Sequence, residues 1–253
     1  MKIYVGTCGF SRSRKLIYRD LDVVELQQTF YNPPPPESLE KMRREAPEEF
    51  IFTVKAWMLI THQYNPKLWR RIKRKIPGKP ENYGFFKNTN EVWWAWQETK
   101  KAAEILKAEI IVFQSPSSFR PTNENIERIK AFFSRITRDI ENVLFGWEPR
   151  GDWWLDQYNS LLEELSTKYG VVIIGDYLRG RIPRIFPRKT AYTRLHGLGG
   201  REVNYKYRYT NDDLINLRKI IEKLDAEKIY ILFNNIYSYE DAVRFKKILG
   251  SDK

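Results

Sequence analysis

Cysteine and histidine are scarce in this chain, with one cysteine and two histidines among 253 residues. A single cysteine cannot form an internal disulfide, which is consistent with a reducing compartment. The chain has no Cys-x-x-Cys and no His-Glu-x-x-His spacing, which argues against a structural zinc site and against a zincin. No apolar run reaches the roughly 18 residues of a membrane span, and the start MKIYVGTCGF resembles a strand instead of a signal peptide. We therefore predict a soluble, cytoplasmic protein.

Short apolar runs alternate with longer amphipathic segments along the chain. The apolar runs predict strands at 2–6, 22–26, 50–56, 109–114, 143–148, 171–176, 190–196 and 229–234. The amphipathic segments predict helices that include 37–45, 90–107, 123–139, 153–168, 212–223 and 239–249. Nearly continuous apolar strands are typical of a parallel sheet covered on both faces. This alternation predicts an α/β fold, a TIM-like (β/α)8 barrel that fills residues 1–253 as a single domain.

A doubly wound open sheet is the alternative fold. It would carry a Gly-x-Gly-x-x-Gly turn after the first strand, because that turn binds the phosphates of a dinucleotide. The chain has Gly6-Thr7-Cys8-Gly9 at this place, which does not match. The barrel is therefore the favoured prediction.

The connection after the third predicted strand, residues 57–90, is a long insertion rich in basic and aromatic residues. Its basic residues are Lys67, Arg70, Arg71, Lys73, Arg74, Lys75, Lys79 and Lys87, and its rings include Tyr64, Trp69, Tyr83, Phe85 and Phe86. The segment 205–209 repeats this composition, and the net charge is +12. Such segments can bind phosphates and stack on bases. They can equally be solvated loops whose rings pack on the barrel. The many Lys, Arg and Glu residues are typical of thermophile proteins.

Seven predicted strands end on a polar residue. These residues are Glu25, Lys55, Gln114, Glu148, Asp176, His196 and Asn234. In a closed barrel such ends gather on one face, so they predict a shared pocket. Alternation along a strand places Arg194 on the same side as Tyr192 and His196, and Arg150 on the same side as Glu148. Three acids near three bases predict mutual pairing and a cluster close to neutral overall.

Six ordered motifs carry a family resemblance along nearly the whole chain. They are GTCGF, VELQQTFY, FTVKA followed by Ile60-Thr61-His62, FQSPSSF, TRLHG and LFNN. With these motifs the chain resembles the family known as domain of unknown function 72. The resemblance implies a TIM-like barrel, similar to sugar isomerases and abasic-site endonucleases in fold alone, and no established reaction comes with it.

The resemblance reaches seven of the candidate site residues, with two departures. The matching positions are Glu25, Lys55, His62, Gln114, Arg194, His196 and Asn234. The family commonly has serine at Cys8, which argues against a thiol nucleophile. After the fifth strand the family usually reads Glu-x-Arg-His, whereas this chain reads Glu148-Pro149-Arg150-Gly151. A mechanism that needs that histidine does not transfer to this chain.

Each candidate also has a purely structural interpretation. His196 is either a site residue or a satisfied core histidine, and His62 either binds a ligand or caps a loop. Lys55 either binds an anion or forms an interior ion pair with Glu25. A Schiff-base role for Lys55 is disfavoured, because nothing in the local sequence lowers the pKa of its amine.

The remaining candidates are open in the same way. Glu148 and Arg150 contact a ligand or only brace one another, and Asp176 joins the site or caps the following turn. Gln114 and Asn234 orient a polar ligand or satisfy the strand ends. Cys8 is interpreted as a small buried residue.

The loop after the seventh strand is rich in glycine. It reads Gly197-Leu198-Gly199-Gly200-Arg201. Connections after strands seven and eight of barrels frequently bind phosphate, because glycine lets backbone N–H groups approach an anion. Arg194 and Arg201 would add charge-assisted hydrogen bonds. Gly197 and Gly199 are therefore predicted to bind ligand.

Two functions are consistent with these features. The first is an enzyme, a hydrolase, lyase or isomerase, that acts on a phosphorylated or polyhydroxylated substrate held by Lys55, Arg150 and Arg194. Glu148 or His196 would move the proton, with Glu25 and Asp176 as further catalytic candidates. No cofactor is predicted; a divalent ion is disfavoured because three bases in the pocket would repel it. The alternative is a protein that binds or processes nucleic acid through 57–90 and 205–209.

Overall fold

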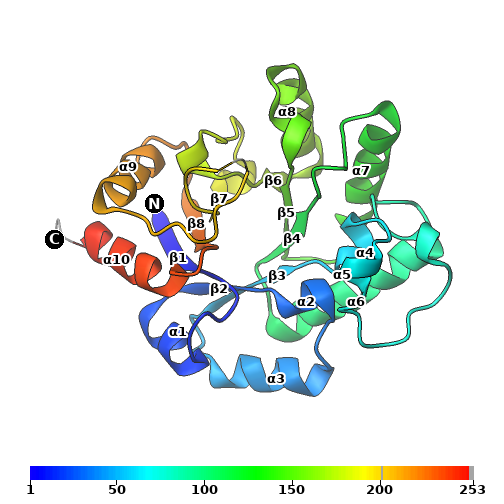
Figure 1. The fold of residues 1–253 in the computed structure, drawn as a ribbon, viewed down its shortest axis with the longest axis horizontal. Coiled ribbons are helices and arrows are strands. Elements are labelled where there is room, and N and C mark those ends of the chain that lie inside the picture. Colours follow the sequence, from blue (N-terminus) through cyan, green and yellow to red (C-terminus); the bar gives the residue numbers. More distant parts are fainter. Residues whose placement is uncertain (201, 251–253) are drawn as a thin grey trace.

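Eight parallel strands form a ring at the centre of the molecule (Figure 1). The computed structural model describes residues 1–200 and 202–250. The strands are β1 (Lys2–Cys8), β2 (Val23–Leu26), β3 (Ile51–Lys55), β4 (Ile110–Gln114), β5 (Leu144–Glu148), β6 (Val171–Ile173), β7 (Thr190–Leu195) and β8 (Lys228–Phe233). Ladders join them in the order β6-β5-β4-β3-β2-β1-β8-β7. A single parallel bridge between Gly175 and Thr193 links the two ends of this order and nearly closes the barrel.

Helices surround the ring and cover its outer face (Figure 1). They are α1 (Arg14–Asp20), α2 (Gln28–Tyr31), α3 (Pro36–Glu45), α4 (Met58–Thr61), α5 (Pro66–Trp69), α6 (Asn90–Leu106), α7 (Asn123–Ile136), α8 (Asn159–Tyr169), α9 (Asn211–Ile221) and α10 (Ser238–Gly250). Threonine caps begin α6, α7 and α9, since Thr89, Thr122 and Thr210 each accept a hydrogen bond from a backbone N–H of the first turn. The predicted TIM-like barrel is confirmed.

The strands alternate between two apolar layers. Side chains such as Val112, Val172 and Leu232 fill the inside of the ring, while neighbours such as Ile111 and Phe233 pack between the sheet and the helices. This period-two pattern is the one that the apolar strands require in a parallel barrel. It also means that a polar residue at an inward position near a strand end faces the barrel mouth.

Several element boundaries differ from the sequence-based expectation. The four-residue helices and α1 were not predicted, because their apolar patterns are too short to show a helical period. The expected helix at 153–168 begins only at Asn159, since two 3-10 turns, Gly151–Trp154 and Asp156–Tyr158, precede it. β6 ends at Ile173 instead of Asp176. A Cβ at Gly175 would lie 2.0 Å from the carbonyl oxygen of Arg181, so the following chain passes close to the backbone at this point.

Most rings of the 57–90 segment pack inward. Tyr83, Phe85 and Phe86 are buried, and Trp69 packs against the core, whereas Tyr64 is exposed. The segment also contains α4, α5 and a 3-10 turn, Pro80–Asn82, so it is not a structureless loop. No helix in the described part of the chain has both the length and the apolar composition to cross a bilayer.

Candidate active site

The carboxyl ends of the strands bring together an acidic and basic cluster inside the barrel mouth. Glu25 lies one residue before the end of β2, Glu148 ends β5, and Arg194 lies one residue before the end of β7. All three side chains are buried, although Glu25 and Arg194 are 169 residues apart in the sequence. Buried charges must be paired with opposite charges, because an isolated buried charge costs several kcal/mol of stability.

Arg194 provides that compensation by bridging two carboxylates. Its Nη2 lies 2.9 Å from Oε1 of Glu25, and its Nη1 donates to Oε2 of Glu148. Glu25 also accepts hydrogen bonds from Tyr192, whose hydroxyl lies 2.8 Å from Oε2, and from the Gln27 amide. The side chain of Arg194 is 1% exposed, so these contacts are shielded from water. Arg194 therefore joins strands from opposite sides of the ring.

A second chain of contacts runs from Glu148 to the end of β7. Arg150 Nη2 lies 2.7 Å from Oε1 of Glu148 and 3.0 Å from Nε2 of His196. Because arginine only donates, Nε2 of His196 is the acceptor and Nδ1 carries the proton. Asp176 accepts the backbone N–H of His196 at 2.9 Å, and Arg179 lies 3.6 Å from the same carboxylate. His196 is thus held from both sides.

Burial and neighbouring charges set the protonation states of this chain of contacts. Burial alone would raise the pKa of Glu148, but the adjacent Arg150 and Arg194 guanidinium groups outweigh it and hold that pKa well below its usual range. Burial lowers the pKa of His196, against the opposing attraction of Glu148. At neutral pH, Glu148 is therefore an anion and His196 a neutral imidazole.

Lys55 lies at the end of β3, beside this cluster, and no carboxylate of residues 1–200 and 202–250 pairs with it. Its Nζ donates to Oε1 of Gln114 at 2.8 Å and lies 3.9 Å from the centre of the Phe30 ring. Burial, together with the positive charge of Arg194, lowers the pKa of Lys55 to about 7. The sequence-based argument that nothing lowers this pKa was wrong. The tertiary fold supplies the burial and the neighbouring arginine, which local sequence does not reveal.

The other predicted residues surround the cluster at the mouth. Gln114, Asn234 and Cys8 are partly exposed at or just after strand ends, and His62, also partly exposed, follows α4. His62 Nδ1 lies 2.8 Å from the Thr61 hydroxyl, and burial with the nearby Lys55 lowers the pKa of His62 to about 3. Burial raises the pKa of Cys8 to about 12, so its thiol stays protonated.

The glycine loop after β7 has a structural use at Gly197. Gly197 has φ +82°, and a Cβ there would lie 2.1 Å from the carbonyl oxygen of Asn204. Its N–H donates to the Tyr209 hydroxyl at 2.7 Å, and its carbonyl accepts from Arg179. The Gly197 N–H is therefore occupied and not free to bind an anion, contrary to the expectation. The Gly199 carbonyl also accepts from Arg179, at 2.7 Å, and Arg201 lies outside the described residues.

Sequence reasoning did not identify three residues that support the cluster. The hydroxyl groups of Tyr192 and Thr53 lie 3.0 Å apart, and the Tyr192 hydroxyl also donates to Glu25. Arg179 forms an ion pair with Asp176. The strand alternation that placed Tyr192 on the side of Arg194 was the available signal. Within residues 1–200 and 202–250, no group of three or more His, Cys, Asp or Glu side chains is arranged to hold a metal ion.

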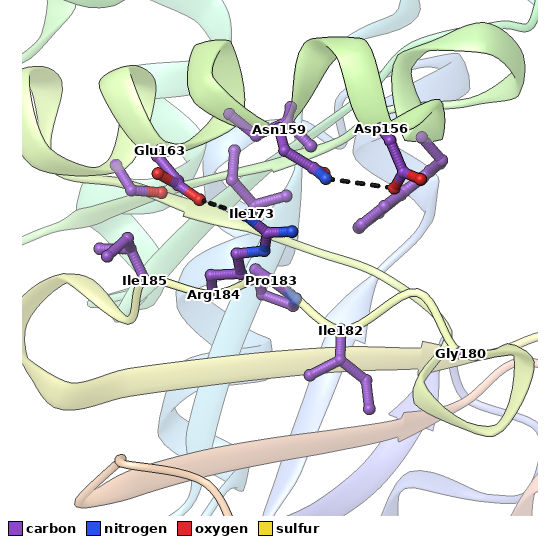
Figure 2. A pocket seen from close by; sticks show the side chains of 12 residues that line it. Asp156, Asn159, Glu163, Ile173, Gly180, Ile182, Pro183, Arg184 and Ile185 are labelled. Atoms are coloured by element: carbon purple, nitrogen blue, oxygen red, sulfur yellow. Dashed lines mark hydrogen bonds and ion pairs between the residues drawn. The ribbon is translucent and has the colours of Figure 1, made fainter.

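A separate pocket lies outside the ring, between α8 and the segment that follows β6. Figure 2 shows Arg184 reaching toward Glu163, with 3.3 Å between Nη1 and Oε1, and Asn159 donating to Asp156 at 3.2 Å. None of its lining residues belongs to the charged cluster. The candidate active site is therefore the barrel mouth and not this pocket.

Comparison with known proteins places the chain in a family. The family model described as "Protein of unknown function DUF72" matches residues 8–253. The chain belongs to the DUF72 family. This DUF72 chain is 26% identical over 250 residues to the UPF0759 protein YunF of Bacillus subtilis strain 168, a match that covers 90% of the chain and 82% of YunF.

Solved structures of DUF72 family proteins have the same barrel. One from Enterococcus faecalis V583 superposes on this DUF72 chain with a TM-score of 0.76 at 18% identity, covering 98% of each chain. One from Thermotoga maritima MSB8 gives a TM-score of 0.67 at 24% identity, covering 99% of this chain and 100% of the other. The endonuclease IV of Thermus thermophilus, with a TM-score of 0.59 at 12% identity and 99% of each chain, shares the fold alone.

Proposed function

We propose that this protein is an enzyme that acts on a small phosphorylated or polyhydroxylated substrate at the barrel mouth. The reaction would be that of a hydrolase, a lyase or an isomerase. The buried, paired cluster at the strand ends carries the proposal. Such groups are expensive to bury, and barrels place their reacting groups at this end of the strands.

The charge balance of the cluster suits a substrate with many hydroxyl groups. Three carboxylates, Glu25, Glu148 and Asp176, lie within ion-pair distance of three guanidinium groups, those of Arg150, Arg194 and Arg179. Such a set offers both donors and acceptors, as hydroxyl groups require. Lys55, which lies at the mouth and donates to Gln114, is outside these pairs, and when protonated it would attract a phosphate.

Unused hydrogen-bonding atoms add to this support. Nε of Arg150, Nε of Arg194 and Oδ1 of Asp176 are buried without a hydrogen-bond partner among the described residues. Each unsatisfied buried polar atom costs about 1–3 kcal/mol, which a ligand or a bound water would recover. Orphaned atoms of this kind are typical of sites that are completed by a substrate.

His196 is the group best suited to move a proton. It is neutral at pH 7, its tautomer is fixed by Arg150 and Asp176, and its Nε2 lone pair faces Arg150 and Glu148. A substrate hydroxyl that replaces the Arg150 contact would meet this lone pair. Glu148, which the two arginines keep ionised, would stabilise the resulting imidazolium.

Loss of His196 or of Glu148 is therefore expected to slow turnover strongly. We expect His196→Ala and Glu148→Gln to lower kcat by about 10²–10⁴, the usual contribution of a positioned proton-transfer group. The measurement is a turnover assay of the purified protein with phosphoesters, sugar phosphates and free sugars, with and without added divalent metal.

Arg184→Ala is the control for that assay. Arg184 is exposed and lies in the outer pocket of Figure 2, so its loss is expected to leave kcat unchanged. The proposal is wrong if no substrate is turned over, or if His196→Ala and Glu148→Gln act as fast as the parent protein.

Nucleic-acid binding is a second candidate, favoured by the exposed charge of the 57–90 segment. Its exposed basic side chains include Lys67, Arg70, Lys73, Lys75 and Lys79. Because most rings of the segment are buried, we infer that any such binding relies on phosphate contacts more than on stacking.

The salt dependence of binding tests this candidate. If about six phosphates are contacted, affinity for duplex DNA is expected to fall by about 10³ between roughly 50 and 200 mM salt. Replacing Lys73 and Lys75 with glutamine should lower this slope by about one per lost phosphate contact. Titrations of labelled single- and double-stranded DNA and RNA would measure it, and absent or salt-insensitive binding would refute the candidate.

A further inference from the structure

Lys55 is the one lysine that is buried among residues 1–200 and 202–250. Its side chain is 6% exposed, and no carboxylate of the described residues lies within ion-pair distance of its Nζ. Its two close partners are the neutral Gln114 amide and the Phe30 ring. Lys55 is therefore buried without being half of an ion pair with a described carboxylate.

The position of Lys55 leaves its amine within reach of a substrate. Gln114, which accepts its hydrogen bond, is partly exposed, and so is His62, which packs edge-on against the same Phe30 ring with 5.0 Å between ring centres. Solvent therefore reaches the immediate neighbours of the amine. A small molecule that reached Gln114 and His62 would therefore lie close to Nζ of Lys55.

An anion-binding role fits these surroundings less well than a nucleophilic one. A lysine that binds by charge needs to be protonated, which burial and the nearby Arg194 oppose. Glu25 and Glu148 favour protonation, but they act on Lys55 more weakly than burial and Arg194 do, and each is paired with an arginine. A neutral amine has a free lone pair, and desolvated lysines of this kind attack carbonyl groups.

We propose that Lys55 forms a covalent imine with the aldehyde or ketone group of the substrate. The inference rests on the proposed function and narrows its substrate to a polyhydroxylated carbonyl compound, such as an open-chain sugar or sugar phosphate. The reaction class becomes that of lyases and isomerases, because an imine draws electrons from the neighbouring carbon.

The bonds and protons of this step balance without a redox partner. The Nζ lone pair forms the N–C bond while the carbonyl π electrons move to oxygen, which takes up the proton that nitrogen releases. The carbinolamine then loses its hydroxyl, with a proton from solvent, as water. A protonated imine remains on Lys55, and its positive charge lies near Glu25 and Glu148, which interact electrostatically with this side chain. His196 would then remove a proton from the adjacent carbon or hydroxyl.

Borohydride trapping tests the inference on the intact protein. The protein is incubated at pH 7 with dihydroxyacetone, dihydroxyacetone phosphate or glycolaldehyde, reduced with sodium borohydride and mapped by peptide mass spectrometry. We expect a secondary amine on Lys55 that forms about 10²-fold faster than on exposed lysines. A pKa near 7 leaves about half of the amine unprotonated, against under about 0.1% at the reference pKa.

Two variants serve as controls, and turnover separates this inference from the proposed function. Lys55→Arg places a positive charge at this position but has no nucleophilic amine, and Lys55→Met has neither a charge nor an amine. We expect both variants to lose the rapid borohydride-trapped adduct and any turnover. If none of the three probes labels Lys55 ahead of the exposed lysines, the inference is wrong. Turnover that survives in Lys55→Arg would overturn the inference and leave the proposed function standing. Trapping on Lys55 without turnover of any substrate would overturn the proposed function instead.

Discussion

Replacing Arg194 with methionine is expected to lower the free energy of unfolding by about 3–5 kcal/mol, the usual loss when one partner of a buried ion pair is removed. Arg194 is the bridge between Glu25 and Glu148. Glu148 would retain Arg150, whereas Glu25 would retain only the Tyr192 hydroxyl and the Gln27 amide. The Glu25 carboxylate, at 0% exposure, would then be buried without an ion-pair partner among the described residues.

Arg184→Met is the matched control for that substitution. Arg184 pairs with Glu163 at 3.3 Å, but its side chain is 67% exposed, so water replaces the lost contact. We expect its loss to cost under about 1 kcal/mol. Chemical denaturation of both variants compares the two sites directly.

A double substitution identifies the cause of the large loss. Arg194→Met combined with Glu25→Gln removes the uncompensated charge while it keeps the shape of the side chain. We expect the double variant to be more stable than Arg194→Met alone, by about 1–3 kcal/mol of coupling. A loss in Arg194→Met no larger than that in Arg184→Met would contradict the buried-cluster account.

The second large effect is a pH-dependent stability caused by Lys55. Its folded-state pKa, lowered by burial to about 7, lies below the unfolded reference near about 10.4. Between these values the unfolded chain binds a proton that the folded chain does not, so stability rises with pH across this window. Below pH 7 Lys55 is protonated in both states. The folded state then carries the full free-energy cost of burying a charged amine. At about 1.36 kcal/mol for each pKa unit, the penalty is about 4–5 kcal/mol at most.

The Lys55→Met variant has no amine to protonate, so it lacks this cost. Comparing its free energy of unfolding with that of the parent protein therefore measures the cost. We expect the difference in unfolding free energy, variant minus parent, to be most positive near pH 6 and to fall by several kcal/mol by pH 10. Titrating groups that do not interact with Lys55 cancel in the difference. Lys67→Met is the control, because Lys67 is exposed and its charge is solvated in both states. A difference for Lys55→Met as flat as that for Lys67→Met would show that the Lys55 amine is not perturbed.

Most strand ends, those of β1 and β6 excepted, were predictable from sequence to within one residue. Parallel strands covered on both faces are nearly continuous in apolar residues, so a polar residue such as Glu148 or Lys55 marks the end of a strand. Alternation along β7 then placed Tyr192, Arg194 and His196 on one side, and in the structure all three contact residues of the same cluster. The barrel fold and the family followed from the same pattern.

The chemistry of the site was not predictable, because it depends on distances between strands. The alternation of side chains along a strand does not show that Arg194 reaches both Glu25 and Glu148. It also does not show that Arg179 donates a hydrogen bond to the Gly197 carbonyl. The same limit applies to Lys55, whose perturbation comes from burial and from Arg194 across the ring. The short helix α1 was missed for a different reason, since seven residues contain too few turns to show a period.

A proton titration of Lys55 tests the central claim most directly. The claim is that the barrel mouth holds a lysine amine that is largely neutral near physiological pH. Lysine side chains labelled with ¹³C at the ε-carbon are followed by NMR from pH 5 to 11, and the Lys55 signal is assigned by its loss in Lys55→Met. We predict that this signal titrates with a midpoint near pH 7, well below the reference value of about 10.4 for a lysine side chain. A Lys55 midpoint above 10 would contradict the account.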